Sequence, residues 1–198
     1  MNSDTTEPYI SKSMRSIRSQ KMEIETIVSL CKTIKPDKKF NVLEIGVYLG
    51  DSTEIFLDSG AVNKLYAIDP WTSDYDINDE TSKSNMIEVE KEFDNRITNR
   101  FDNAIKHKGT IDSFKDTKFD RIDIVYIDGS HRYEDVLHDI ITTVNHIRPS
   151  IAICGHDFYL AQNGIYTIQK ALSETIGWPD VILGMASWMK FRNTYSWL

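Results

Sequence analysis

The chain has 198 residues, of which 40% are hydrophobic and 27% charged, and its formal net charge at pH 7 is −7. These values are typical of one globular domain with a substantial core, and they argue against an extended nucleic-acid-binding surface. The sequence shows no apolar signal core, no charge-free stretch of membrane-spanning length and no cysteine pattern for disulfides or metals, so we expect a cytoplasmic protein without a membrane partner.

The predicted elements alternate between helices and strands, which indicates an α/β fold. Residues 1–19 are polar and are expected to form a flexible segment, whereas residues 20–198 are expected to fold as a single domain. This domain opens with a helix that has an apolar face and ends near Pro36. A βαβ unit follows, with a strand, a helix and a strand at 40–45, 52–57 and 64–68.

An acidic insertion at 71–95 separates this unit from the later elements. Its first half is expected to be a loop, and Met86, Ile87, Val89 and Phe93 predict a helix in its second half. The insertion can serve as a lid at the active edge or form a solvated excursion, and both interpretations stay open. The remaining predicted elements are strands at 104–108, 121–127 and 150–154, a helix that carries apolar residues from 136 to 144, a helix at 165–175, and strands at 181–186 and 188–192.

The stretch IDIVYIDGSHRYEDVLHD, residues 122–139, places polar groups at the end of an apolar strand. Asp128 follows the strand, and Gly129 permits a sharp turn. Ser130 can cap the next helix, so His131 lies near the start of that helix and beside Asp128. Because ligands of open α/β sheets bind outside the carboxyl ends of strands, this stretch predicts a functional site.

Two further acids stand at the ends of predicted strands. Glu44 precedes Gly46 and Gly50 in VLEIGVYLGDST, where missing side chains let a ligand approach the backbone. The pattern differs from the dinucleotide fingerprint G-x-G-x-x-G because an acid occupies the strand end before the first glycine. An acid at this place disfavours a pyrophosphate. Asp69 ends the next strand, and its carboxylate can accept the hydroxyl hydrogens of a ribose. Alternatively, Glu44 caps a helix and Asp69 begins a turn with Pro70.

The motifs LEIGVYLGDST, AIDPW, YIDGSHRYEDV and GHDF occur in this order along the chain. In their order and spacing they resemble the class I S-adenosylmethionine-dependent methyltransferases, specifically the subgroup related to macrolide-sugar O-methyltransferases and cephalosporin-hydroxylase-like proteins. The resemblance covers about Gln20 to Arg192. It implies a Rossmann-like α/β fold in which a seven-stranded, mostly parallel sheet has its last strand antiparallel and helices on both faces.

By position in these motifs, the resemblance places S-adenosylmethionine along the carboxyl ends of the strands. The motif around Glu44 would surround its amino acid portion, Asp69 would bind its ribose, and the segment GTIDSF would form the adenine wall. Asp128 and His131 would face the methyl-bearing sulfur. The expected cofactor-binding residues are Glu44, Gly46, Gly50, Asp69, Trp71, Thr110, Ile111, Asp112 and Asp128.

Methyl transfer to an alcohol requires a group that removes the hydroxyl proton, and His131 is the candidate general base. The alternative is a histidine that only hydrogen-bonds locally at a helix start. Asp157 follows the strand at 150–154, so it can lie beside Asp128 and hold a divalent cation with it. The macrolide-sugar enzymes have two adjacent acids where this chain has His156 and Asp157. This departure leaves open whether Asp128, His156 and Asp157 bind a metal, and it favours manganese over magnesium.

The leading hypothesis is S-adenosylmethionine-dependent methylation of a hydroxyl on a saccharide or glycosylated small molecule. One alternative is a catalytically silent cofactor-binding regulatory or partner protein, and another is a nicotinamide-dependent oxidoreductase with a similar sheet. The set of Asp128, His131 and Asp157 favours an enzyme, and the lack of G-x-G-x-x-G argues against a nicotinamide cofactor. The expected partner is a small-molecule or saccharide acceptor, no nucleic acid is expected, and self-association into a homo-oligomer stays open.

Overall fold

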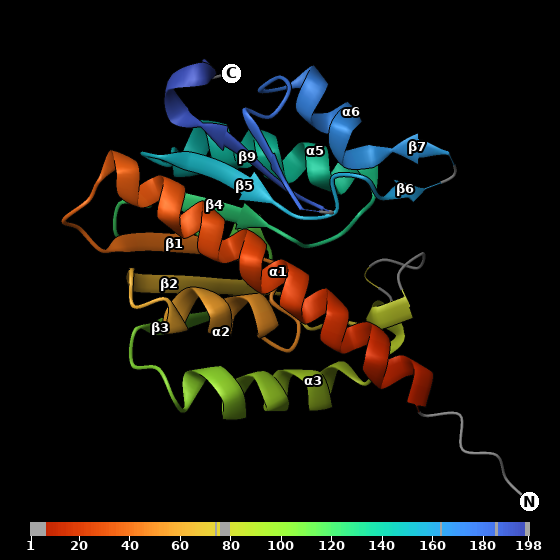
Figure 1. The fold of residues 1–198 in the computed structure, drawn as a ribbon. Helices are drawn as coiled ribbons and strands as arrows, with labels where there is room; N and C mark the ends of the chain where they lie inside the picture. Colours follow the sequence, from red (N-terminus) through yellow and green to blue (C-terminus); the bar gives the residue numbers. More distant parts are fainter. Residues whose placement is uncertain (1–6, 74, 76–79, 163, 185, 197–198) are drawn as a thin grey trace, which may run out of the picture.

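The computed structural model describes residues 7–73, 75, 80–162, 164–184 and 186–196. Its centre is a seven-stranded sheet in the order β3-β2-β1-β4-β5-β9-β8 (Figure 1). The strands of this sheet are β1 (Phe40–Ile45), β2 (Val62–Asp69), β3 (Ala104–Lys108), β4 (Ile124–Ile127), β5 (Ala152–Gly155), β8 (Val181–Leu183) and β9 (Ser187–Phe191). A separate two-stranded hairpin consists of β6 (Ala161–Gln162) and β7 (Ile165–Tyr166).

The five strands from β3 to β5 in sheet order run parallel, and β9 runs antiparallel to both β5 and β8. Strand β1 pairs with β2 on one side and with β4 on the other. Such a reversal of strand order opens a crevice at the carboxyl ends of the parallel strands. The predicted Rossmann-like sheet, mostly parallel with an antiparallel closing strand, is confirmed.

Helices cover both faces of the sheet (Figure 1). One face carries α1 (Glu7–Ile34), α2 (Asp51–Asp58) and α3 (Met86–Phe93), and the other carries α4 (Ile111–Lys115), α5 (Tyr133–Thr142) and α6 (Thr167–Glu174). The helix predicted from residue 165 starts two residues later as α6, because residues 165–166 pair with β6. Short turns of 3-10 or π helix are η1 (Glu80–Lys83), η2 (Asp94–Thr98), η3 (Thr143–Ile147) and η4 (Arg192–Thr194).

Side chains of β1 alternate between the two cores of the protein. Phe40 and Val42 pack in the core under α1 and α2, whereas Leu43 and Ile45 pack in the core under α4, α5 and α6. Glu44 therefore points to the face that α2 covers. Among the described residues, no helix combines the length and the apolar composition that crossing a bilayer requires.

Helix α1 extends along one face of the sheet to the carboxyl ends of the strands (Figure 1). Residues 7–19, expected as part of a flexible segment, are helical, and residues 1–6 lie outside the described residues. The buried carboxylate of Glu23 accepts hydrogen bonds from the backbone N–H (3.2 Å) and the hydroxyl (2.5 Å) of Ser187. Because β9 is antiparallel, Ser187 lies near the carboxyl end of β5, and this contact brings α1 to the active edge.

The acidic insertion at 71–95 contains the predicted helix, which is α3. Residues 74 and 76–79, in the part expected to be a loop, lie outside the described residues. The ring of Phe93 in α3 is buried and packs 5.1 Å, centroid to centroid, from the ring of buried Trp71. The second half of the insertion therefore belongs to the core of the fold.

The close packing of β4, β5 and β9 predicts that Gly155→Ala destabilises the protein. A Cβ at Gly155 would lie 2.5 Å from the Ile127 carbonyl oxygen and 2.6 Å from the Trp188 ring. We expect a loss of about 1–3 kcal/mol in the free energy of unfolding, measured by chemical denaturation. Gly129→Ala is the control, because its nearest neighbour would be 3.7 Å away. Equal stabilities of the two variants would contradict this packing.

Candidate active site

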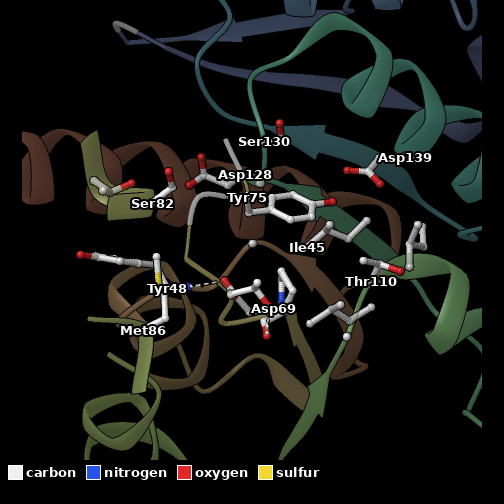
Figure 2. Close-up of a pocket in the computed structure, with 18 residues that line it drawn as sticks. Ile45, Tyr48, Asp69, Tyr75, Ser82, Met86, Thr110, Asp128, Ser130 and Asp139 are labelled. Atoms are coloured by element: carbon white, nitrogen blue, oxygen red, sulfur yellow. Dashed lines mark hydrogen bonds between the residues drawn. The ribbon is translucent and has the colours of Figure 1, made fainter. Parts of the chain in front are cut away.

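A cavity opens at the carboxyl ends of β1, β2 and β4 (Figure 2). Its walls come from the loops after β1, β3 and β4, from the end of β2 and from part of the insertion. Five of the predicted cofactor-binding residues line it, namely Gly46, Asp69, Thr110, Ile111 and Asp128. The crevice that the strand order predicts is therefore a cavity lined by the polar motifs of the sequence.

Two glycines shape the loop after β1. A Cβ at Gly46, where φ is 83°, would lie 2.4 Å from the carbonyl oxygen of Asp128, so only glycine lets the two loops approach. Gly50 has a φ of 86°, and a Cβ there would lie 2.6 Å from the side chain of Ile97. Gly46 is thus at the cavity, whereas Gly50 packs against η2 and does not line the cavity.

The carboxylate of Asp69 at the end of β2 holds the loop after β1 by hydrogen bonds. It accepts backbone hydrogen bonds from Val47 (3.1 Å), Tyr48 (2.9 Å) and Trp71 (2.7 Å). Burial raises the pKa of Asp69, and the three donors oppose the rise. The buried indole of Trp71 donates to the Tyr48 carbonyl (3.1 Å), so Trp71 supports the loop from outside the cavity.

The side chains of Glu44 and Asp112 do not line the cavity. Glu44 is fully buried and accepts hydrogen bonds from the hydroxyls of Ser52 and Thr53 in α2. Burial raises the pKa of Glu44 to about 8, although both hydroxyls favour its charged form. Asp112 forms an ion pair with Lys115 (2.7 Å) on its own helix. Glu44 therefore supports the wall from the buried side, whereas Asp112 faces the surface.

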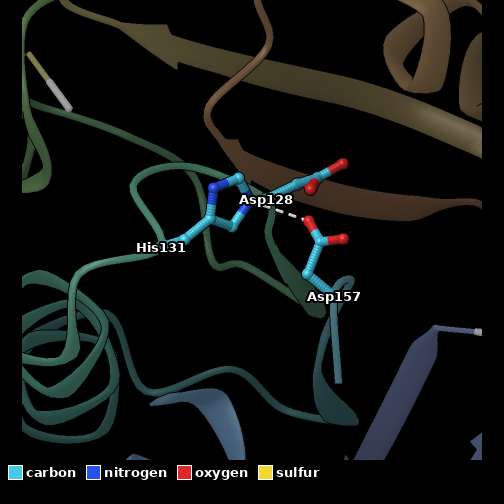
Figure 3. Close-up of side chains that lie close together, drawn as sticks. All are labelled: Asp128, His131 and Asp157. Atoms are coloured by element: carbon cyan, nitrogen blue, oxygen red, sulfur yellow. Dashed lines mark hydrogen bonds and ion pairs between the residues drawn. The ribbon is translucent and has the colours of Figure 1, made fainter. Parts of the chain in front are cut away.

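Asp128, His131 and Asp157 converge at one end of this edge (Figure 3). Nε2 of His131 and Oδ2 of Asp157 are 2.8 Å apart, which is a hydrogen bond. One possible ligand atom from each of the three side chains lies within 4.8 Å of the other two. The structure thus brings together the predicted catalytic residues and Asp157, with Asp157 rather than Asp128 as the hydrogen-bond partner of His131.

His156 lies among three carboxylates next to this cluster. Its Nδ1 is 3.2 Å from Asp157 and 3.8 Å from Asp128, and its Nε2 is 3.8 Å from Glu23. Burial alone would lower the pKa of His156, but the acids raise it to about 9. Burial raises the pKa of Asp128 to about 6 against the effect of His156. Burial would also raise the pKa of Asp157, yet His131 and His156 hold it below its ordinary value.

Two polar residues of α1 reach the cluster and were not predicted as site residues. Nε2 of Gln20 donates to Oδ2 of Asp128 (3.0 Å), and Glu23 lies beside His156. Both share a helix face with Ile27 and Cys31, which are buried. Polar residues at core-facing helical positions are the sequence signal that could have identified them.

The insertion also contributes to the cavity wall. Tyr75, Thr81, Ser82 and Met86 line it, and Figure 2 shows Ser82 and Met86 at the end far from Thr110. The sequence indicates an insertion at the active edge but not these individual residues, because no helical or strand period precedes Met86.

A second hollow adjoins the cavity. Gly46 and Asp128 line both, whereas Gln20, His131 and Asp157 line only the second. Asp128 therefore stands where the two hollows meet, and His131 and Asp157 face the second hollow. Such an arrangement can hold one ligand on each side of the reacting groups.

The strand order, the antiparallel β9 and the cavity beside β1 and β4 together define the class I methyltransferase fold. A family model described as a methyltransferase domain matches residues 43–158, which is more than half of the chain. The chain belongs to this methyltransferase family. A search of curated protein sequences finds no match.

Two solved structures with TM-scores of 0.50 or more show the same fold at low sequence identity. The chain is similar to the magnesium protoporphyrin IX methyltransferase of Synechocystis PCC 6803, solved with bound S-adenosylmethionine, with a TM-score of 0.55, 10% identity and coverage of 96% of this chain and 84% of that one. A Thermotoga maritima S-adenosylmethionine-dependent O-methyltransferase has a TM-score of 0.50 and 12% identity, with coverage of 76% of this chain and 49% of that one. Streptomyces venezuelae DesVI has a TM-score of 0.48 and 14% identity, with coverage of 78% of this chain and 58% of that one. The chain thus spans about half the length of the last two proteins.

The buried Glu44 predicts that stability falls as pH rises between about 4.5 and 8. In this window the unfolded chain releases the proton of Glu44 while the folded protein retains it, so ionisation favours unfolding. Glu44→Gln removes this titration. We expect the free energy of unfolding of this variant, measured by chemical denaturation and taken relative to that of the wild type, to rise progressively from pH 5 to pH 8, by on the order of a few kcal/mol at pH 8.

Glu54→Gln on the surface of α2 is the matched control. Burial alone would raise the pKa of Glu54, but Arg96 and Arg100 lower it, so the charged form of Glu54 stabilises the folded state. Relative to the wild type, the stability of this control should fall as the pH rises to about 4.5 and then stay constant from pH 5 to pH 8. Parallel pH profiles for the two variants would contradict the assignment of Glu44.

Proposed function

We propose that this protein is an S-adenosylmethionine-dependent O-methyltransferase that acts on a hydroxyl of a saccharide or glycosylated small molecule. The observation that carries the proposal is the His131–Asp157 hydrogen bond beside Asp128, where the two hollows meet. A histidine oriented by a carboxylate can remove a hydroxyl proton. Membership of a methyltransferase family supports methyl transfer, and the motif resemblance supports the saccharide acceptor.

In this proposal S-adenosylmethionine lies along the first cavity. Gly46 lines this cavity beside the amino acid portion of the cofactor, and Glu44 and Gly50 support that loop through their contacts with α2 and η2. Asp69 retains acceptor capacity for the ribose hydroxyls, since three donors occupy only part of its two oxygens. The loop after β3, with Thr110, walls the adenine.

His131 takes the acceptor's hydroxyl proton as the oxygen bonds to the methyl carbon and the carbon–sulfur bond breaks. When Nε2–H of His131 donates to Asp157, Nδ1 is the nitrogen that receives the proton. Asp157 then stabilises the imidazolium that forms. Holding the two reactants in line contributes up to about 7–11 kcal/mol, and the general base contributes about 10²–10⁴ in rate.

A divalent cation fits the same cluster. Asp128 and Asp157 offer carboxylate oxygens and His131 offers an imidazole nitrogen, and these atoms lie within 4.8 Å of one another. His156, the predicted ligand, lies 3.2 Å from Asp157 and 3.8 Å from Asp128, and a metal would have to displace its proton. Imidazole in the ligand set favours manganese over magnesium. A bound cation would hold a diol of the acceptor and acidify one hydroxyl.

The insertion supports a small, uncharged acceptor. Its residues already form part of the cavity wall, as a lid would. The chain carries a net charge of −7, which disfavours a polyanionic acceptor or nucleic acid. A neutral sugar or polyhydroxylated molecule is compatible with both features.

His131→Ala tests the proposed general base. We expect turnover with a sugar acceptor to fall by about 10²–10⁴, while the dissociation constant of S-adenosylhomocysteine changes little. Radiolabelled methyl transfer and calorimetry measure the two quantities. His146→Ala in η3 is the matched control, because this histidine is exposed. Unchanged turnover in His131→Ala would exclude the proposed base, and cofactor binding without transfer to any acceptor class would favour the silent regulatory protein.

Chelation tests the cation separately. We expect a chelator to remove most turnover and Mn²⁺ to restore it better than Mg²⁺, because the cluster includes imidazole. Methyl transfer is measured before and after the metal is added back. Full turnover in the chelator would show that His131 and Asp157 act without a metal.

A further inference from the structure

Asp139 is a carboxylate of the cavity with no role in the proposed reaction. It projects from α5 and lines the first cavity. Figure 2 shows it on the same side of the cavity as Thr110, opposite Ser82 and Met86. Thr110 belongs to the loop after β3, so Asp139 lies where the proposed cofactor presents its adenine.

Among the described residues, the acids near Asp139 have hydrogen-bond or ion-pair partners, whereas Asp139 has none. Asp135 accepts hydrogen bonds from Ser130 (2.6 Å) and Arg132 (2.7 Å). Asp112 pairs with Lys115 and with His138 (2.8 Å). Asp139 forms no hydrogen bond or ion pair within the part of the chain that the structure describes. Its carboxyl group is therefore available to a ligand.

The surroundings of Asp139 favour a donor from the ligand. Burial, together with the negative charges of Asp135 and Asp112, raises the pKa of Asp139 to about 7. Leaving such a group without a partner is costly, so a ligand that donates a hydrogen bond gains from it. Ile45 and Ile111 line the same cavity and offer apolar contact to a flat ring.

We propose that Asp139 is a specificity residue for the cofactor, whose carboxyl group accepts a hydrogen bond from the 6-amino group of adenine. The proposal rests on the proposed use of S-adenosylmethionine. The 6-amino group is the exocyclic donor of adenine, and an inosine in its place presents a carbonyl oxygen. When Asp139 is ionised, at a pH above about 7, two oxygens would then face each other, so the site would discriminate between the two bases.

The test compares S-adenosylhomocysteine with S-inosylhomocysteine by calorimetry on the full chain. We expect the wild type to bind the adenosyl compound about 10- to 100-fold more tightly, the range for a hydrogen bond to a charged or buried group. In Asp139→Asn, whose amide can also donate, the preference should shrink to within about threefold. Glu134→Gln, exposed on the same helix, removes the same charge and should keep the wild-type preference.

The outcomes separate this inference from the function on which it rests. A wild type that binds neither compound overturns the proposed cofactor and Asp139 with it. A wild type that binds S-adenosylhomocysteine but not selectively, or an Asp139→Asn variant that keeps full selectivity, overturns the role of Asp139 alone. Thermal unfolding of the free variants checks the fold, and we expect Asp139→Asn to be no less stable than the wild type, because it removes an unpaired acid.

Discussion

Three backbone N–H groups donate to the carboxylate of Asp69, and the rest of the site is arranged around the loop that they hold. The loop can lie against Asp128 only because Gly46 has no side chain. The ends of β1, β2 and β4 are thereby fixed relative to one another before a ligand arrives. A ligand that binds here does not have to order this part of the chain, which lowers the entropic cost of binding.

Strand ends were predictable from the sequence, whereas side-chain partners were not. Asp69 and Asp128 each follow a β-branched or apolar run, and in a parallel sheet such acids meet at one edge. The partners depend on elements distant in sequence. Glu44 meets hydroxyls of α2 because strand alternation turns it away from the cavity. Gln20 and Asp128, which form a hydrogen bond, are 108 residues apart, so no local pattern could reveal their contact.

The histidines and carboxylates at the end of β5 form one electrostatic unit. His156 is surrounded by Glu23, Asp128 and Asp157, and its positive charge offsets part of their mutual repulsion. A divalent cation would do the same with more charge. The replacement of an acid by His156 in the motif therefore makes the net charge of the cluster less negative. That charge affects how strongly the cluster attracts a divalent cation such as manganese and how readily His131 accepts a proton.

The hydrogen bonds between Glu23 and Ser187 connect residues 164 positions apart in the chain. During synthesis, α1 leaves the ribosome long before β9, so Glu23 lacks these partners until almost the whole domain has emerged. Burying this carboxylate before the two Ser187 donors are in place would remove water without replacing all of its hydrogen bonds, which is unfavourable. The nascent sheet can thus assemble from β1 to β5, but α1 docks fully only when the closing strand arrives. The part of the site that α1 contributes, with Gln20 and Glu23, is therefore completed at the end of folding.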